Sequence, residues 1–234
     1  MSSFSLRLIA LLCMIADHAG LALFPNIGAF RCAGRLAFPL YCFLLAQGFI
    51  HTRSVRAYGR RLLLLALISE IPFDLLIFGR VASGIEQNVL FSLLFGLMAL
   101  YAADALHSRP LLAGASAALL CMGAMLCRVS YGWLGVILCL CVYYAQENKR
   151  FLSASLAAAL LVYSLSLLCS GVTMSWVLVS LCALFSLIPL LFYNGKRGLR
   201  HPALTFAFYA AYPLHIACLL VIRALRIIPP YFLG

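Results

Sequence analysis

The sequence predicts an all-α protein, a polytopic transmembrane bundle of about nine membrane-spanning helices. Of its 234 residues, 65% are hydrophobic and only 10% are charged, and the mean hydropathy is +1.08. Soluble domains of this size are far more polar. Apolar runs of roughly 17 to 20 residues also recur along the chain, and each run is long enough to cross a hydrocarbon core of about 30 Å.

Nine such runs follow one another with short connections. They cover residues 6–24, 32–50, 62–78, 88–105, 111–127, 131–146, 151–169, 175–193 and 203–222. Asp17 and His18 interrupt the first run and eight more runs follow, so we expect the first run to be a retained span and not a cleaved secretory signal. The longest connections, residues 51–61, 79–87 and 194–202, are too short for a soluble catalytic domain. Residues 1–234 are therefore predicted to form a single integral-membrane domain.

The basic residues predict the topology of the bundle. The net charge is +11, but its carriers fall between spans, which indicates membrane orientation and not nucleic-acid binding. Eleven would share the side of the N-terminus and six the other side, so the positive-inside rule places the N-terminus in the cytoplasm and nine spans place the C-terminus outside. The eleven are Arg7, Arg53, Arg56, Arg60, Arg61, Arg109, Lys149, Arg150, Lys196, Arg197 and Arg200, and the six are Arg31, Arg35, Arg80, Arg128, Arg223 and Arg226.

The ten cysteines do not have the spacing of a zinc site, and eight of them fall within apolar runs. We therefore interpret most of them as small hydrophobic residues, with no metal expected and no disulfide framework.

Buried ionisable residues are costly in a membrane and usually functional. Counted at 1.5 Å per residue from the cytoplasmic end of each span, Glu70 lies at about 12 Å, and His18, Asp74 and His215 lie at about 18 Å. These side chains are predicted to form one layer facing a shared interior cavity, because they cannot face lipid cheaply.

Arg35 enters from the opposite side and is expected close to Tyr131, Gln87 and Asn88. Glu70 and Asp74 lie four residues apart on one helix face, with Pro72 between them, so they either form a structural salt bridge with Arg35 or support a site.

The first span carries a second pattern. Arg7 and His18 are eleven residues apart, and eleven steps of 100° make three full turns plus 20°, so the two side chains share one helix face. Along the helix axis they are about 16.5 Å apart. Asp17 points about 100° away from His18 and is not expected to orient it.

Several strings resemble the TraX family, named for the integral-membrane enzyme that acetylates the N-terminus of F-type conjugative pilin. The strings are LRLIALLCMIADHAG, GRLAFPLYCFLLAQGF, SEIPFD, QNVLFSLLFG, YGWLGV and YPLH, spread from Leu6 to His215. The resemblance implies a multi-pass acetyltransferase of the bacterial inner membrane that uses acetyl-CoA. The spacing of Arg7 and His18 is also distantly similar to the first-helix signature of acyltransferase-3-type enzymes, whose arginine and histidine serve catalysis.

These observations combine into a mechanistic hypothesis. Arg7 holds the phosphates of acetyl-CoA at the cytoplasmic surface, and the basic loop with Arg53, Arg60 and Arg61 assists. The pantetheine arm is comparable in length with the rise from Arg7 to His18, which serves as general base on the acceptor. Either Arg35 or Tyr131 stabilises the oxyanion, and Glu70 and Asp74 hold Arg35 or position His18. Asp17 and His215 complete the predicted catalytic set.

Two other classes of protein fit parts of the pattern. A transporter or proton-coupled channel would use the same acids and histidines as a relay, but the sequence lacks the repeated halves and broken-helix pairs of many transporters. A noncatalytic assembly subunit would need no layer of ionisable groups. The acceptor, an amine or hydroxyl on a pilin-type protein or an envelope metabolite, stays open.

Overall fold

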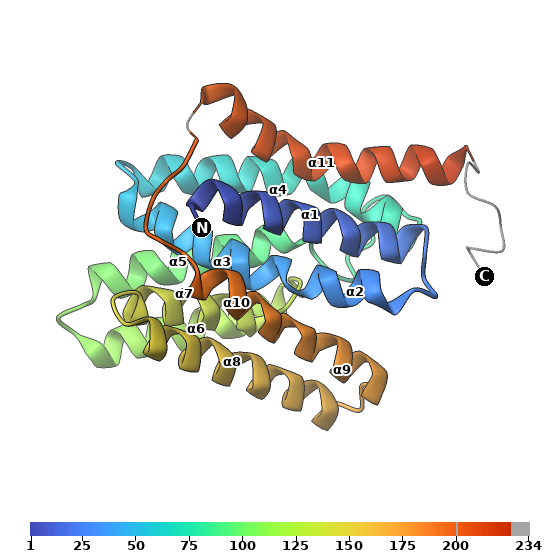
Figure 1. Ribbon diagram of the computed structural model, residues 1–234. Coiled ribbons are helices and arrows are strands. Elements are labelled where there is room, and N and C mark those ends of the chain that lie inside the picture. Colours follow the sequence, from blue (N-terminus) through green and yellow to red (C-terminus); the bar gives the residue numbers. More distant parts are fainter. Residues whose placement is uncertain (200, 226–234) are drawn as a thin grey trace. The chain divides into compact units, whose positions relative to one another are not determined.

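The computed structural model describes residues 1–199 and 201–225, so Arg200 and Arg226, which the topology prediction used, lie outside the described residues. Within this part the protein is helical, and its one extended pairing is an isolated bridge between Gln87 and Val129. In chain order (Figure 1) the helices are α1 (Ser3–Ala22), α2 (Gly28–Arg35), α3 (Ala37–His51), α4 (Val55–Phe78), α5 (Val89–Ala105), α6 (Pro110–Leu126), α7 (Trp133–Ala145), α8 (Lys149–Cys169), α9 (Met174–Leu181), the 3₁₀ helix η1 (Cys182–Ser186), α10 (Leu187–Leu191) and α11 (Pro202–Ala224).

The predicted apolar runs each correspond to one helix or to two or three successive helices in the described chain. Helices α2 and α3 follow each other with only Leu36 between them, and α9, η1 and α10 form one continuous helical stretch. Counted in this way, the described residues form the nine helical segments that the sequence predicts.

The sequence predicts nine membrane spans, but fewer of these segments are long enough and apolar enough to cross a membrane. Five in the described chain are long and apolar enough: α1, α2 with α3, α8, α9 to α10, and the part of α11 from Phe206 onward. Helices α5, α6 and α7 are apolar but have 17, 17 and 13 residues, about 20 to 26 Å of rise, which is short of a 30 Å core. Helix α4 is long enough, but it carries three arginines and two acids. The protein is therefore a multi-pass helical membrane protein in which five spans are clear.

The chain forms two compact units, which we describe separately. Unit 1 consists of Met1–Leu40, Ser69–Ser83 and the described residues from Leu160 on. In this unit α1 packs against α2 and α11, and α2 packs against α9. The first turn of α1 is tied to the segment before α11, because the N–H groups of Ser3 and Phe4 donate to the carbonyls of Lys196 and Arg197 at 2.8 and 3.2 Å. These bonds satisfy donors that a helix start leaves without an intrahelical partner.

Unit 2 consists of Tyr41–Ile68 and Gly84–Ala159. Its centre is formed by α5, α6 and α7, which pack against one another. The start of α5 is fixed by Asn88, a fully buried residue whose side chain accepts from the N–H of Leu90 at 3.0 Å and donates to the carbonyl of Ala66 at 2.9 Å. Asn88 thus caps α5 and links it to α4, because one amide side chain supplies both the acceptor and the donor.

Candidate active site

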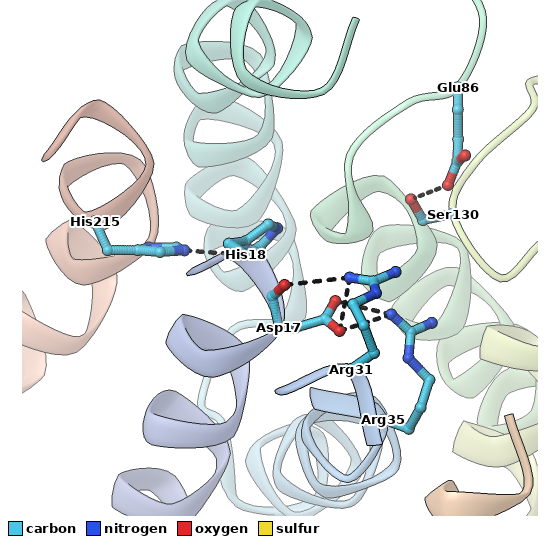
Figure 2. A network of polar contacts seen from close by, with 7 residues as sticks. All are labelled: Asp17, His18, Arg31, Arg35, Glu86, Ser130 and His215. Atoms are coloured by element: carbon cyan, nitrogen blue, oxygen red, sulfur yellow. Dashed lines mark hydrogen bonds and ion pairs between the residues drawn. The ribbon is translucent and has the colours of Figure 1, made fainter. Parts of the chain in front are cut away.

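Asp17 of α1 binds two arginines of α2 in unit 1, as Figure 2 shows. Nη1 of Arg31 lies 2.8 Å from Oδ1 of Asp17, and Nη2 of Arg35 lies 2.9 and 2.8 Å from the two carboxylate oxygens. Nη1 of Arg31 also donates to the main-chain carbonyl of Asp17 at 3.2 Å. The three side chains retain only 13 to 17% of their exposure. The carboxylate of Asp17, the residue that precedes His18, therefore holds two largely buried guanidinium groups.

Two glycines bring α1 and α2 close enough for this arrangement. A Cβ on Gly34 would occupy the space of the Asp17 side chain, and a Cβ on Gly20 would meet the Cβ of Phe30. Small residues at a helix interface allow such a close approach, which matters inside a membrane because packing replaces the hydrophobic effect there. Glycine at position 34 thus leaves the space that the Asp17 side chain occupies against α2.

His18 of α1 is hydrogen-bonded to His215 of α11, within unit 1. The distance between Nδ1 of His18 and Nε2 of His215 is 2.9 Å, and the two ring centroids are 4.9 Å apart. Tyr212 adds an edge-on ring contact to each of the two histidines. His18 keeps 8% of its exposure, so the ring is buried among these neighbours. This contact confirms the prediction that His18 and His215 lie at the same depth.

The hydrogen bond between His215 and the carbonyl of Ala211 determines which ring nitrogens of the histidine pair carry a hydrogen. Nδ1 of His215 lies 2.7 Å from the carbonyl oxygen of Ala211. Because a carbonyl only accepts, Nδ1 of His215 must carry the hydrogen, and Nε2 of the neutral ring is then an acceptor. Nδ1 of His18 is consequently the donor in the pair when both rings are neutral, which leaves the lone pair of His18 on Nε2. The His18 side chain makes no other hydrogen bond to a described residue.

The two acids of α4 lie in unit 1, but Asp74 does not have the predicted partner. The buried Asp74 carboxylate accepts from the N–H of Ser83 at 2.6 Å and from its hydroxyl at 2.9 Å. Of the two alternatives for Asp74, the salt bridge with Arg35 is therefore wrong: Arg35 binds Asp17, and Asp74 fixes the segment that follows α4. Glu70 is half-buried on the same helix, one turn earlier.

The arginines predicted to hold the donor are exposed. Arg7 lies in the second turn of α1 in unit 1, on the helix that carries the buried His18. Arg53, Arg60 and Arg61 lie just before and within α4 in unit 2. The guanidinium of Arg61 lies 5.9 Å from the ring centroid of Tyr58, a cation–π distance. The predicted cooperation of Arg7 with these three residues stays a prediction.

Tyr131 belongs to a polar cluster of unit 2, so its predicted proximity to Arg35 stays a prediction. Tyr131 has a left-handed backbone, with φ of 63°, in the turn before α7. Its neighbour Ser130 donates to the carboxylate of Glu86 at 2.6 Å, as Figure 2 also shows, and the main chains of Ser130 and Gln87 are hydrogen-bonded. The hydroxyl of Ser92 donates to the carbonyl of Ser130. These bonds hold the turn in a conformation that a non-glycine residue rarely adopts.

Arg31 is the site residue that the sequence analysis did not select. It was used only in counting charges, yet it binds the same carboxylate as Arg35. The available signal was its spacing, because residues four apart in a helix share a face. Arg31 also lies over the ring of Trp176 of α9, 5.3 Å from its centroid. Across residues 1–199 and 201–225, no group of three histidine, cysteine, aspartate or glutamate residues is arranged to hold a metal ion.

Comparisons with known proteins agree on one family. The family model described as TraX protein matches residues 2–223. A curated relative, the probable fimbrial assembly protein FimC, serogroup H1, of Dichelobacter nodosus, is 36% identical over 234 aligned positions, covering 93% of this chain and 94% of the relative. No solved structure matches. Since the family match extends over nearly the whole sequence, the resemblance seen in the motifs is confirmed: the chain belongs to the TraX family.

Proposed function

We propose that this protein is an integral-membrane acetyltransferase that moves an acetyl group from cytoplasmic acetyl-CoA to an amine or hydroxyl acceptor. The observation that carries the proposal is the buried pair of His18 and His215, which leaves an unprotonated ring nitrogen on His18. Membership of the TraX family supports this activity, and the relative named as a fimbrial assembly protein supports an acceptor of the pilin type. We place the protein in the bacterial cytoplasmic membrane with its N-terminus inside.

In the proposed reaction His18 acts as a general base. The acceptor nitrogen or oxygen attacks the thioester carbonyl while Nε2 of His18 takes the proton from the acceptor. The tetrahedral intermediate then collapses, the carbon–sulfur bond breaks, and the departing sulfur of coenzyme A receives the proton from the His18 imidazolium. The proton is thus returned in each cycle, and His215 keeps the accepting nitrogen of His18 unprotonated at the start of the reaction.

The paired arginines suit the charge that develops on the carbonyl oxygen. Arg31 and Arg35 place two guanidinium groups on Asp17, and fixed cationic donors stabilise an oxyanion where water is excluded. In this proposal Arg35 is the oxyanion donor, with Tyr131 as the alternative, and Asp17 orients the guanidinium groups. Without Asp17, two largely buried cations would lose the carboxylate that both of them bind, which is costly in a medium of low polarity.

The donor is proposed to enter beside Arg7. The rise of α1 between Arg7 and His18 is about 16.5 Å, so a thioester at His18 leaves the phosphates of acetyl-CoA near the helix start. A guanidinium group binds phosphate through several parallel hydrogen bonds, and the positive end of the helix dipole also attracts anions. Arg53, Arg60 and Arg61 are proposed to add positive charge on the same side of the membrane.

A transporter or proton channel is the second candidate, and the histidine pair gives it less support. A proton relay needs groups that both accept and donate at each step. The bonds from His18 through His215 end at the carbonyl of Ala211, which cannot pass a proton on. The pair is better suited to fixing one tautomer than to conducting protons.

The test is acetyl transfer by the purified full-length protein in lipid nanodiscs. Labelled acetyl-CoA is offered with a pilin N-terminal peptide, a sugar and a small envelope amine, and the labelled product is identified. We expect covalent transfer to one acceptor and a loss of about 10²- to 10⁴-fold in His18→Ala, the range for a missing general base. The matched control is His51→Ala, because His51 is an exposed histidine at the end of α3. Equal activity of the His18 variant, or transport of solute without labelled product, would contradict the proposal.

A further inference from the structure

Unit 2 contains an open pocket that the proposed transferase site does not use. It lies where α3 ends, α4 begins, and α5 and α7 end, and its volume is about 560 Å³. Pockets of a few hundred to a thousand Å³ are typical of small-molecule sites. All of its lining residues belong to unit 2, and the topology predicted from the arginines places this end of the helices in the cytoplasm.

The lining of this pocket is acidic in a strongly basic protein. The chain has 17 lysines and arginines but only six aspartates and glutamates, and two of the six, Asp104 and Glu147, line the pocket, whereas no lysine, arginine or histidine does. Neither carboxylate forms an ion pair with a described residue. Asp104 accepts at Oδ1 from the hydroxyl of Tyr143 at 2.8 Å, and Glu147 makes no side-chain hydrogen bond within the described part. Oxygen acceptors are thus available to a ligand.

Aromatic rings line the same pocket. Phe49 and Tyr143 meet edge to face with centroids 6.0 Å apart, and Tyr143 and Tyr144 do so at 5.2 Å. The faces of aromatic rings attract cations, most strongly when the cation is partly removed from water. Carboxylates and aromatic rings therefore favour the same kind of ligand, and the carboxylates repel an anion such as the phosphates of acetyl-CoA.

We propose that this pocket binds an organic ammonium ion, a single cationic amine carried on a compact apolar body. The rings contact the alkyl groups around the nitrogen, and Asp104 and Glu147 supply the counter-charge. The proposal does not rest on the transferase activity, because none of the lining residues belongs to the proposed active site.

The first experiment compares ligands of equal shape and different charge on the full-length protein in nanodiscs. Choline is titrated by calorimetry against its uncharged isostere 3,3-dimethylbutan-1-ol, and adenosine 3′,5′-bisphosphate represents the anionic part of coenzyme A. We expect choline to bind at least about tenfold more tightly than the isostere, since the positive charge is the only large difference. Equal binding of the isostere, no saturable binding of choline, or displacement of choline by the bisphosphate would overturn the proposal.

The second experiment locates the binding site with shape-preserving variants. Asp104→Asn and Glu147→Gln keep the size of each side chain and remove its charge, so each should raise the dissociation constant of choline several-fold. The matched control is Glu86→Gln, which removes one negative charge from unit 2 at a residue that does not line the pocket. Thermal melting of each variant confirms that it is folded. If the control weakens choline binding as much as the pocket variants, the ammonium ion is not bound in this pocket.

Discussion

At the scale of single residues, the tautomer of His18 depends on a main-chain carbonyl of another helix. Ala211 accepts from Nδ1 of His215, His215 accepts from Nδ1 of His18, and the lone pair of His18 is thereby confined to Nε2. A histidine held in this tautomer is not partly populated in the other one, in which Nε2 carries the hydrogen and cannot accept a proton. In the proposed reaction the role of His215 is therefore to position and orient His18, and it needs no contact with the substrate.

This role predicts different results for two replacements of His215. His215→Gln keeps an acceptor oxygen that can reach Nδ1 of His18, whereas His215→Leu removes the acceptor. We expect the leucine variant to lose about 10- to 100-fold in kcat, as is usual when the group that orients a histidine is removed, with little change in the KM for acetyl-CoA. The glutamine variant should recover part of the loss. Steady-state kinetics in nanodiscs measures both, and equal kcat values for the two variants would contradict the orienting role.

The residues of the site could be predicted in part from the sequence. The depth count brought His18 and His215 together, because rise per residue is a fixed property of a helix. It could not identify the partner of Arg35, since Asp17 and the α4 acids were both within reach and only the packing of α1 on α2 decides between them. The partner of Asp74, Ser83, lies in an irregular segment whose path helix geometry does not specify.

At the scale of elements, the close approach of α1 and α2 depends on Gly34. A methyl group at this position would overlap the Asp17 side chain, whereas a Cβ on Gly28 of the same helix would meet nothing within 4 Å. We expect Gly34→Ala to lower stability by about 1 to 3 kcal/mol, the usual cost of overpacking, and Gly28→Ala to leave it nearly unchanged. Thermal unfolding in detergent compares the two variants. Equal melting temperatures would show that α1 and α2 do not require this contact.

The ends of the helices show why hydropathy predicts some boundaries better than others. Helix α5 ends at Ala105 and α8 at Cys169, as the apolar runs indicated, because a polar connection follows each of them. Helix α4 begins at Val55, seven residues before the predicted run, because a helix continues through Arg56, Arg60 and Arg61 even though these residues are not apolar. A search for apolar runs detects the part of a helix that suits lipid and omits the part that extends beyond it.

At the scale of the whole molecule, the beginning of the chain is hydrogen-bonded to the segment before α11, within unit 1. The N-terminal amine donates to the carbonyl of Phe192, and the first turn of α1 donates to Lys196 and Arg197. The beginning of the chain and the segment before α11 therefore lie on the same side of the membrane. This agrees with an alternating order of nine helical segments, in which an even number of crossings separates the two positions.

The alternating order predicts which connections react from which side of the membrane. In a variant whose ten cysteines are replaced by alanine, single cysteines are introduced at four exposed positions, His107, Lys196, Arg80 and Ser170. We expect His107→Cys and Lys196→Cys to react in intact spheroplasts only with a membrane-permeant maleimide, because the positive-inside rule places these basic connections in the cytoplasm. Arg80→Cys and Ser170→Cys should also react with an impermeant maleimide. Labelling of His107→Cys and Lys196→Cys from opposite sides would mean that one of the helical segments between them, α6 to α10, does not cross the membrane. The short helices α6 and α7 would then be the first to re-examine, because the charged α4 precedes both positions and would not explain that result.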